Sequence, residues 1–259
     1  MPVTDLPLLI DAARRSGQIA SGYFGQSPDV WDKPDDAGPV TAADLAVNEM
    51  LRDTLTQTRP DYGWLSEETE DDSARLDRSR VFVVDPIDGT RAFINGSHDW
   101  AHSLAVVEDG QVTSAAVYLP MRDLMFAATR GGGATLNGAP IGVAAGTDLG
   151  APHVLMHKAN LDGRFWKDGK APAMKAGFRS SLAYRLCLVA QGRFDAMLTL
   201  RPTWEWDVAA GTLIVQEAGG SATQQTGAAV HFNNPHPQLA GLVAGGAAHG
   251  PIVDCIDCN

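Results

Sequence analysis

Two aspartates, Asp85 and Asp88, follow directly after a run of apolar residues in the segment 81–90. The apolar residues before Asp85 predict a buried strand, and Pro86 should end its ladder of hydrogen bonds because proline has no N–H to donate. Gly89 permits a tight bend, after which residues 90–93 should open a short helix whose backbone N–H groups attract anions. Carboxylate and carbonyl oxygens are the ligands that Mg²⁺ prefers. The segment therefore predicts a site for a hard cation together with a phosphate.

Each acidic residue that fits such a site also has an ordinary structural interpretation. An isolated pair of aspartates at this spacing is commonly a turn residue followed by a helix cap, although carboxylates at a buried strand end cost free energy unless they are paired or bound to metal. Glu67 begins an acidic run that would be ordinary in a solvent-exposed segment without any functional role. Asp44 fits the first turn of a helix, and Asp207 fits an N-cap that stabilises its helix by about 1 kcal/mol. Only their combination indicates a site.

Composition restricts the class of protein. The 259 residues are 44% hydrophobic and 20% charged, as in a globular protein built from one large domain or two fused halves. No apolar run reaches the roughly 18–20 residues of a membrane span, and the first residues do not resemble a signal peptide. The three cysteines, Cys187, Cys255 and Cys258, favour the reducing cytoplasm. We therefore expect a cytoplasmic protein that has no membrane partner.

The net charge of −11 argues against a nucleic-acid polymer as partner. An acidic protein can still bind a phosphorylated substrate when metal ions supply the positive charge. The histidines show no metal-ligand spacing, so His98 and His102 are expected to be structural or rim residues. Cys255 and Cys258 form one pair only, without the second half of a zinc site, and the glycines at 131–133 are expected to form a hairpin turn.

Hydrophobic periodicity places the acidic residues on helices and strands. Helices are predicted at 6–24, 41–58, 182–191 and 207–218, with a further one at 161–168. Strands are predicted at 64–66, 81–85, 104–107, 112–118, 124–129, 153–157 and 194–200. Residues 26–38 are predicted to be a loop, and 69–80 an exposed connection. Strands and helices alternate only in the second part, which predicts two halves, 1–145 and 146–259, and an α/β layer in the second.

Four motifs, in this order, resemble those of the inositol monophosphatase superfamily, which are magnesium-dependent, lithium-sensitive phosphomonoesterases. The two long motifs are Asp85-Pro-Ile-Asp88-Gly-Thr90 and Trp206-Asp207-Val-Ala-Ala-Gly211 with Glu217-Ala-Gly-Gly220 behind it. The two short motifs are Val40-Thr41-Ala-Ala-Asp44, which is similar to the threonine–acidic element, and Ser66-Glu67-Glu68, in which serine replaces the glycine of Gly-Glu-Glu. The resemblance covers nearly the whole chain.

The resemblance implies a fold and a role for each matching residue. The fold would be α/β (α+β), a layered αβαβα sandwich of the inositol monophosphatase/fructose-1,6-bisphosphatase type, as a possible homodimer. The implied ligands of two to three Mg²⁺ ions are Glu67, Asp85, the Ile87 carbonyl, Asp88 and Asp207. Asp44, Thr90 and Glu67 would be catalytic, with Asp44 and Thr90 orienting and deprotonating the attacking water. The backbone amides of Gly89 and Thr90 would contact the phosphate, and lithium would inhibit at submillimolar to millimolar concentration.

The residues before Asp207 bear on the substrate. Inositol phosphatases have an acidic residue there that contacts the sugar hydroxyls, whereas Thr199 and Leu200 are not acidic. The segments 180–190, 201–207 and 230–234 instead resemble the bacterial 3'(2'),5'-bisphosphate nucleotidases, which remove the 3'-phosphate of 3'-phosphoadenosine 5'-phosphate. The resemblance implies that Ser181, Arg185 and Arg201 bind the substrate, and an arginine such as Arg185 or Arg201 would meet a second phosphate bidentately. Trp204 or Phe232 would stack on a base.

Two other functions stay open from the sequence alone. One is an inositol-1-phosphate or broad sugar-phosphate phosphatase that uses the same metal ligands. The other is a regulatory binding protein that keeps the phosphatase fold without needing its catalysis. The complete set of implied ligands favours an enzyme, and the missing carboxylate at 199–200 favours the bisphosphate nucleotide.

Overall fold

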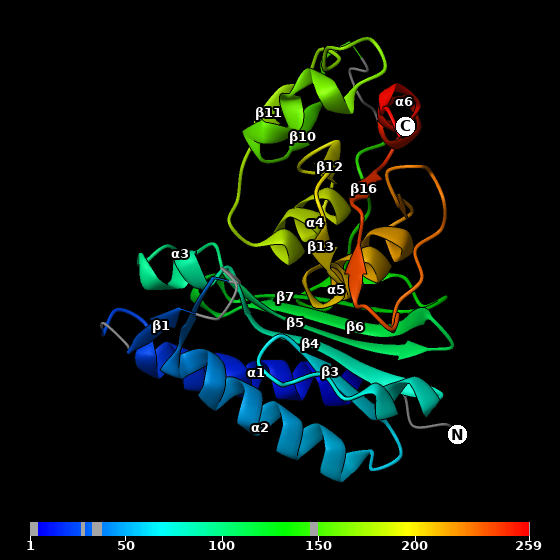
Figure 1. Cartoon of the computed structure of the whole chain (residues 1–259). Coiled ribbons are helices and arrows are strands. Elements are labelled where there is room, and N and C mark those ends of the chain that lie inside the picture. Colours follow the sequence, from blue (N-terminus) through cyan, green and yellow to red (C-terminus); the bar gives the residue numbers. More distant parts are fainter. Residues whose placement is uncertain (1–4, 27–28, 33–37, 146–149, 259) are drawn as a thin grey trace.

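A seven-stranded sheet forms the centre of the N-terminal part of the molecule (Figure 1). In this computed structural model, which describes residues 5–26, 29–32, 38–145 and 150–258, the strand order is β3-β4-β5-β6-β7-β8-β9. β3 and β4 pair in parallel and the other neighbours pair antiparallel. The strands are β3 (Gly63–Ser66), β4 (Arg80–Asp88), β5 (Ala101–Glu108), β6 (Gln111–Leu119), β7 (Leu124–Thr129), β8 (Ala134–Leu136) and β9 (Ala139–Pro140). The predicted strands at 64–66, 104–107, 112–118 and 124–129 are confirmed, as is the turn at 131–133, which joins β7 to β8.

Two helices, α1 (Leu6–Tyr23) and α2 (Ala42–Thr58), lie along one face of this sheet (Figure 1). Their buried residues form one apolar cluster with Phe82, Val84 and Leu104 from the sheet. α2 begins at a capping box, because the Thr41 side chain accepts from the helix backbone while Asp44 accepts from the Thr41 backbone N–H. The sequence predicted both helices, and the threonine start of the second.

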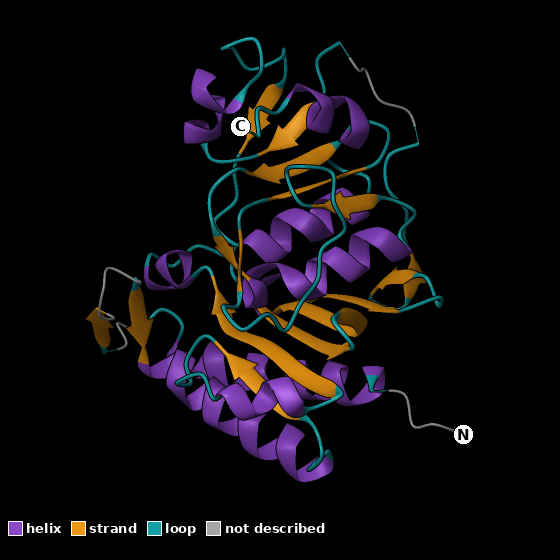
Figure 2. Cartoon of the chain, turned by 45° about the vertical axis from the view of Figure 1, so that its right-hand side comes forward, coloured by secondary structure: helices purple, strands orange, loops and turns teal. Residues whose placement is uncertain are grey.

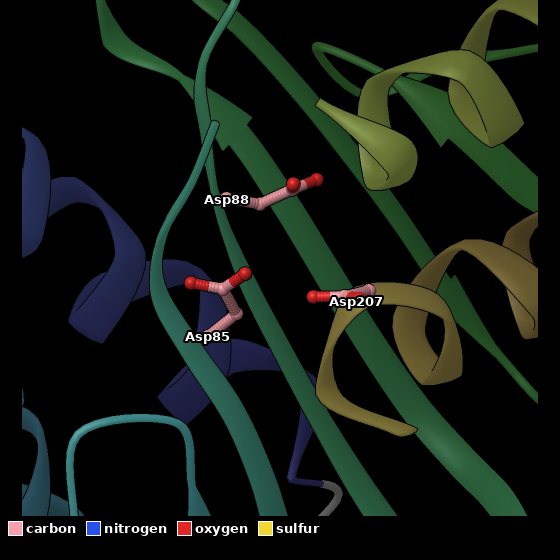
Figure 3. A group of neighbouring side chains, drawn as sticks. All are labelled: Asp85, Asp88 and Asp207. Atoms are coloured by element: carbon pink, nitrogen blue, oxygen red, sulfur yellow. The ribbon is translucent and has the colours of Figure 1, made fainter. Parts of the chain in front are cut away.

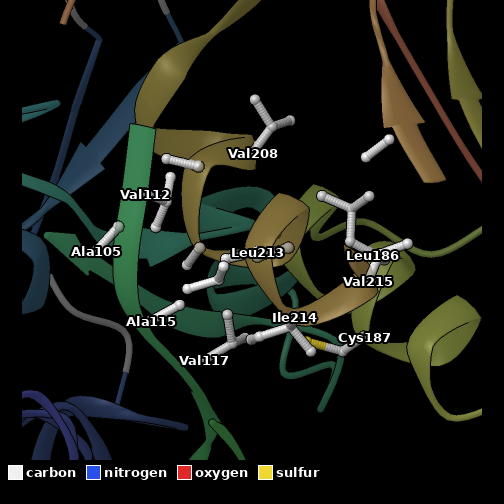
Figure 4. Packing of buried hydrophobic residues seen from close by; sticks show 14 of the residues in the cluster. Ala105, Val112, Ala115, Val117, Leu186, Cys187, Val208, Leu213, Ile214 and Val215 are labelled. Atoms are coloured by element: carbon white, nitrogen blue, oxygen red, sulfur yellow. The ribbon is translucent and has the colours of Figure 1, made fainter. Parts of the chain in front are cut away.

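The other face of the sheet packs against α4 (Leu182–Ala190) and α5 (Glu205–Glu217). Figure 4 shows Val117 of the sheet beside Ile214 of α5 and Cys187 of α4, all of them fully buried. Both helices are buried nearly all round, as expected for a helix layer between two sheets. Their N-terminal ends therefore have fixed positions over β4 and β5.

A second sheet of five strands covers the far side of α4 and α5 (Figure 2). Its strand order is β11-β10-β12-β16-β14, from β10 (His153–Leu155), β11 (Lys175–Gly177), β12 (Ala196–Thr199), β14 (Ser221–Thr223) and β16 (Leu242–Gly245). Its outer face packs against α6 (His249–Cys255) and the 3₁₀ turns η4 (Lys158–Leu161) and η5 (Gly163–Phe165). The succession of helix, sheet, helix, sheet and helix layers confirms the predicted αβαβα sandwich.

Several short elements differ from the prediction. The helix predicted at 161–168 is wrong: Gly163 interrupts this stretch, which contains the last residue of η4 followed by η5. The predicted loop 26–38 contains strand β1 (Val30–Asp32), which pairs with β2 (Pro39–Thr41), while 27–28 and 33–37 lie outside the described residues. The sequence also missed α6, β14 and β16, and the pair β13 (Thr203–Trp204) and β15 (Gln238–Leu239).

The prediction that β4 ends at Asp85 is also wrong. β4 continues through Pro86 to Asp88, and its register with β5 shifts between Asp85, opposite Ser103, and Asp88, opposite Ala101. Three steps along β4 thus match two along β5, which is a β-bulge. Proline is tolerated at such a point because the ladder needs no N–H from it.

The remaining described elements are short connections. They are η2 (Ser73–Asp77), α3 (Thr90–Ile94) and η3 (Pro120–Arg122). None of the helices in the described part of the chain has the length and apolar composition needed to cross a membrane. The boundary predicted between 1–145 and 146–259 stays a prediction, and residues 146–149 beside it lie outside the described ranges.

Candidate metal and phosphate site

Three aspartates from two elements meet on the face of the seven-stranded sheet that α4 and α5 cover. Asp85 and Asp88 lie on β4 and Asp207 lies on α5, and one carboxylate oxygen of each lies within 4.8 Å of those of the others. Figure 3 shows the two β4 side chains on one side and Asp207 reaching toward them from the start of α5. Successive strand residues point to opposite faces, so aspartates three apart would normally diverge. The bulge in β4 returns Asp88 to the same face as Asp85.

Asp85 is the most deeply desolvated of the three carboxylates. Its residue is 1% exposed, and its Oδ1 atom has no hydrogen-bond partner within the part of the chain that the structure describes. The side chain of Glu67, which follows β3, lies within hydrogen-bonding reach of it. Burial, together with the negative charges of Glu67, Asp88 and Asp207, raises the pKa of Asp85 well above its usual range.

Asp88 points toward the N-terminal end of α4 (Figure 3). Its Oδ2 accepts from the Ser181 hydroxyl at 2.6 Å and from the Ala183 backbone N–H at 2.7 Å, and its Oδ1 accepts from the Leu182 N–H at 3.2 Å. Burial raises the pKa of Asp88 to about 6, against the opposing effect of these hydrogen bonds and of the Arg185 charge. Asp88 therefore connects β4 to α4 as well as facing the other aspartates.

Asp207 occupies the first turn of α5. The N-cap of this helix is Trp204, so the interpretation of Asp207 as an N-cap is wrong. Its Oδ2 accepts from the Thr203 hydroxyl at 3.2 Å. Burial and the charges of Asp88 and Glu67 raise the pKa of Asp207 well above its usual range. A negative charge in the first turn is favourable for the helix dipole. Asp207, which is partly buried, is nevertheless repelled by the buried carboxylates of Asp85 and Asp88.

The donor set fits a divalent cation. Clustered buried carboxylates are stable only when they are protonated, paired or bound to metal. Asp85 Oδ1 has no hydrogen-bond partner among the described residues, although the Asp85 carboxylate lies close to two others. Oxygen ligands without histidine or thiolate suit Mg²⁺, Ca²⁺ or Mn²⁺ better than zinc. Glu67 is half-buried beside this cluster and adds a fourth carboxylate.

Thr90 and Asp44 form a second group beside the aspartates. The Thr90 hydroxyl lies 3.3 Å from Asp44 Oδ1 and 3.1 Å from the Ile87 carbonyl oxygen. Asp44 Oδ2 accepts from the Thr41 hydroxyl at 2.5 Å and from the Thr41 backbone N–H at 2.9 Å. The capping box of α2 therefore fixes one Asp44 oxygen, while the other faces Thr90.

Gly89 makes the turn between β4 and α3 possible. Its φ of 96° is left-handed, and a Cβ atom there would lie 3.1 Å from the Asp99 carbonyl oxygen. The chain reverses at this glycine, and Thr90 follows as the first residue of α3. The predicted bend and short helix at 90–93 are confirmed.

Two cavities open beside the site. One, of about 250 Å³, is lined by Glu67, Gly89 and Thr90 among others. The other, of about 460 Å³, is lined by Asp207, Arg185, Arg201 and Trp204 among others. Arg91, Phe178 and Ser180 line both cavities.

Arg185 and Arg201 lie together in the larger cavity. Burial lowers the pKa of Arg185 to about 10, and the neighbouring charge of Arg201 acts in the same direction, against Asp88 and Asp207. Arg185 Nε donates to the Arg179 carbonyl at 2.6 Å, and its guanidinium lies 4.5 Å from the centroid of the Phe178 ring. Arg185 is 6% exposed, whereas Arg201 is exposed. The two arginines bring positive charge next to Asp207.

Two residues occupy places other than those expected from the sequence. Ser181 is fully buried, and its hydroxyl caps α4 and donates to Asp88, so it supports the aspartate instead of lining a cavity. Phe232 is 4% exposed and lines a separate cavity of about 370 Å³, away from the aspartates. Of the two aromatic residues considered for base stacking, Trp204 is the one that lines the cavity with the arginines.

Sequence reasoning missed Arg91 and Phe178 at the site. Arg91 directly follows Thr90 in the motif, so a cation beside the expected phosphate position was a usable signal. Phe178 is 50% exposed and follows the short strand β11, where no motif marked it.

A comparison with known protein families finds that residues 4–252 match the inositol monophosphatase family. The chain belongs to this family. It is 32% identical to an inositol-1-monophosphatase of Rhizobium meliloti, over 86% of both chains. It is 35% identical to the Nus factor SuhB of Escherichia coli, over 86% of this chain and 85% of that one.

A solved structure shows the same fold. An IMPase from Thermotoga maritima superposes with a TM-score of 0.82 at 27% identity, over 96% of this chain and 94% of that one. Family membership supports phosphoric monoester hydrolysis of a small phosphorylated substrate at a metal-dependent site. The named relatives differ in function, so membership alone specifies neither the ester nor the partners.

Proposed function

We propose that this protein is a Mg²⁺-dependent phosphomonoesterase that hydrolyses the 3'-phosphate of 3'-phosphoadenosine 5'-phosphate, giving AMP and phosphate. The observation that supports hydrolysis is the cluster of Asp85, Asp88 and Asp207, with Glu67 beside it. The observation that supports a substrate with a second anionic group is the pair of arginines in the cavity next to Asp207.

The carboxylates and the Ile87 carbonyl would hold two to three Mg²⁺ ions. Bound there, the ions supply positive charge to the phosphate oxygens, the attacking water and the leaving oxygen. The backbone amides of Gly89 and Thr90 contact the phosphate at the start of α3 and hold it in line for attack. In this proposal the leaving oxygen of the ester faces the larger cavity, where Arg185 and Arg201 lie.

Asp44 and Thr90 act on the attacking water. The Thr90 hydroxyl accepts a hydrogen bond from the water and donates its own proton toward Asp44 Oδ1, 3.3 Å away. The capping box holds Asp44 in place, because Thr41 binds its other oxygen. Water attacks phosphorus as its proton passes by way of Thr90 to Asp44, and the ester P–O bond breaks. The leaving 3'-oxygen takes up a proton from solvent water, so that the nucleoside 3'-hydroxyl and phosphate are the products.

The second phosphate would be bound by Arg185 and Arg201. Arginine presents parallel N–H groups that match two phosphate oxygens, and such charged hydrogen bonds are worth about 1.5–3 kcal/mol each. Trp204 has the ring area to stack on the base. Thr199 lines the same cavity and offers no carboxylate for sugar hydroxyls.

Two alternatives use the same fold. Hydrolysis of inositol 1-phosphate or a sugar phosphate is favoured by the name of the Rhizobium relative. A regulatory role is favoured by the relatives named Nus factor; it would be supported if an Asp88→Asn variant retained all cellular function.

Substrate comparison tests the proposal. Phosphate release is measured from adenosine 3',5'-bisphosphate, from 3'-AMP and from inositol 1-phosphate, in wild type and in Arg201→Ala. We expect the bisphosphate to be preferred, and its KM to rise about tenfold or more in Arg201→Ala. The kinetics with 3'-AMP should stay nearly unchanged in that variant, because this nucleotide has no second phosphate.

A surface arginine provides the matched control. Arg164 pairs with Asp162 in an exposed ion pair outside both cavities. Arg164→Ala should leave all three substrates unaffected. A clear preference of the wild type for inositol 1-phosphate would refute the nucleotide assignment while leaving the phosphatase chemistry intact.

A further inference from the structure

The bulge in β4 has two residues, Pro86 and Ile87, between the ladder positions of Asp85 and Asp88. Both are buried, and buried carbonyl groups need hydrogen-bond donors. The Ile87 carbonyl oxygen lies 3.1 Å from the Thr90 hydroxyl and is one of the proposed metal ligands. The Pro86 carbonyl accepts from a side chain of the neighbouring strand, His102 Nδ1, at 2.5 Å.

His102 approaches the bulge from the opposite face of the sheet. It lies on β5 between Ala101 and Ser103, the residues opposite Asp88 and Asp85. Because strand residues alternate in direction, it points toward α1 and α2, where Phe93 and Trp100 are buried. The Trp100 ring meets the imidazole edge-on, with centroids 5.4 Å apart. The imidazole is therefore enclosed and has one orientation.

The hydrogen bond fixes the tautomer of His102. A carbonyl only accepts, so Nδ1 carries the proton and donates it. Nε2 is then an acceptor, and it is buried with no hydrogen-bond partner in the described ranges. A buried polar atom without a partner costs free energy that an apolar residue would avoid. The presence of histidine at this position is therefore explained by the hydrogen bond that its Nδ1 donates to the Pro86 carbonyl.

The next residue on β5, Ser103, makes a matching contact on the other face. Its hydroxyl donates to the Trp206 carbonyl at 2.9 Å, directly before Asp207. Adjacent residues of one strand thus bind the bulge that bears Asp85 and Asp88, and the first turn of the helix that bears Asp207.

We propose that His102 and Ser103 are positioning residues that set the distance and orientation of the three aspartates toward the metal. His102 holds the bulge that turns Asp88 to the face of Asp85. Ser103 holds the start of α5 against the same strand. The inference rests on the proposed metal site but concerns different residues, neither of which touches the substrate.

Direct metal binding tests the roles. Mn²⁺ and Mg²⁺ affinity is measured by calorimetry in wild type, His102→Asn, His102→Leu and Ser103→Ala, with the melting temperature of each metal-free protein. The Asn Nδ2 atom occupies the same place along the side chain as His Nδ1 and can donate to Pro86. We expect the dissociation constant of His102→Asn to stay within about threefold of the wild-type value. That of His102→Leu should rise about tenfold or more, as is typical when a residue that orients metal ligands is replaced.

Other variants keep the test decisive. If His102→Leu does not fold, His102→Gln replaces it, because its longer side chain moves the amide away from the Pro86 carbonyl; the same loss of affinity is expected. Ser103→Ala should weaken binding several-fold with kcat/KM recovered at saturating metal. Equal losses in His102→Asn and His102→Leu, or lower melting temperatures with unchanged metal affinity, would overturn the proposal. Absence of metal binding by the wild type would instead refute the proposed function.

Discussion

Asp85, Asp88 and Asp207 are held close together with raised pKa values, that of Asp88 at about 6. A carboxyl whose pKa is higher in the folded than in the unfolded state binds more protons when folded. Its contribution therefore favours the folded state at low pH and is lost as pH rises through the folded pKa. The repulsion that a cation would relieve is greatest once the carboxyls are ionised.

The metal-free protein should thus become less stable with rising pH. In the presence of a chelator, we expect the melting temperature to fall by several degrees between about pH 5 and about pH 7.5, and Mg²⁺ to restore it at the higher pH. Asp85→Asn should flatten this dependence, because it removes one of the buried charges. A chelated wild type that is more stable at the higher pH would contradict the assignment.

At the scale of elements, the site depends on close contact between α4 and α5. Gly211 of α5 faces Leu186 of α4, and a Cβ atom there would lie 2.5–2.6 Å from atoms of Leu186. Asp88 meets the N-terminal end of α4, and Asp207 lies in the first turn of α5. The separation of the two helices therefore affects the aspartates directly.

Gly211→Ala should push α4 and α5 apart and lower the free energy of unfolding by about 1–3 kcal/mol, as overpacking does elsewhere. Gly22→Ala is the control, since Gly22 lies in helix α1 and no atom of the described residues lies within 4 Å of a Cβ atom there. This substitution should be neutral or stabilise by about 0.5–1 kcal/mol. Urea unfolding of both variants measures the difference. Equal changes in the free energy of unfolding would show that helix propensity, and not the contact with Leu186, determines the effect of Gly211→Ala.

Elements with a strong pattern were predictable from the sequence, and locally irregular ones were not. The capping residues at 41–44 and the apolar strands of the first sheet indicated α2 and β5 to β7 correctly. Pro86 was misinterpreted because proline ends a regular ladder of hydrogen bonds. Here it occupies a bulge, which is defined by the pairing of β4 with β5 and is therefore not apparent from the sequence of β4 alone. The stretch 161–168 was predicted to be helical, but Gly163 interrupts it, and Phe165 and Trp166 pack into the outer apolar cluster instead.

At the scale of the whole molecule, the site is formed by parts distant in sequence. Glu67 follows β3, Asp85 and Asp88 lie on β4, and Asp207 comes from α5. Motif resemblance predicted this set, and the structure brings three of its aspartates within 4.8 Å. The sequence could not show how His102 and Ser103 support them, because these contacts join residues 16 and 103 positions apart.

The central claim is that the clustered carboxylates make phosphate-ester hydrolysis metal-dependent. The most direct measurement is phosphate release from adenosine 3',5'-bisphosphate during Mg²⁺ titration of wild type and Asp85→Asn. We predict a rate that rises from near zero to saturation in the wild type, and a loss of about two orders of magnitude or more in the variant, because an amide is a weaker ligand than a carboxylate. A wild-type rate that does not depend on Mg²⁺, or an equal rate in Asp85→Asn, would contradict the account.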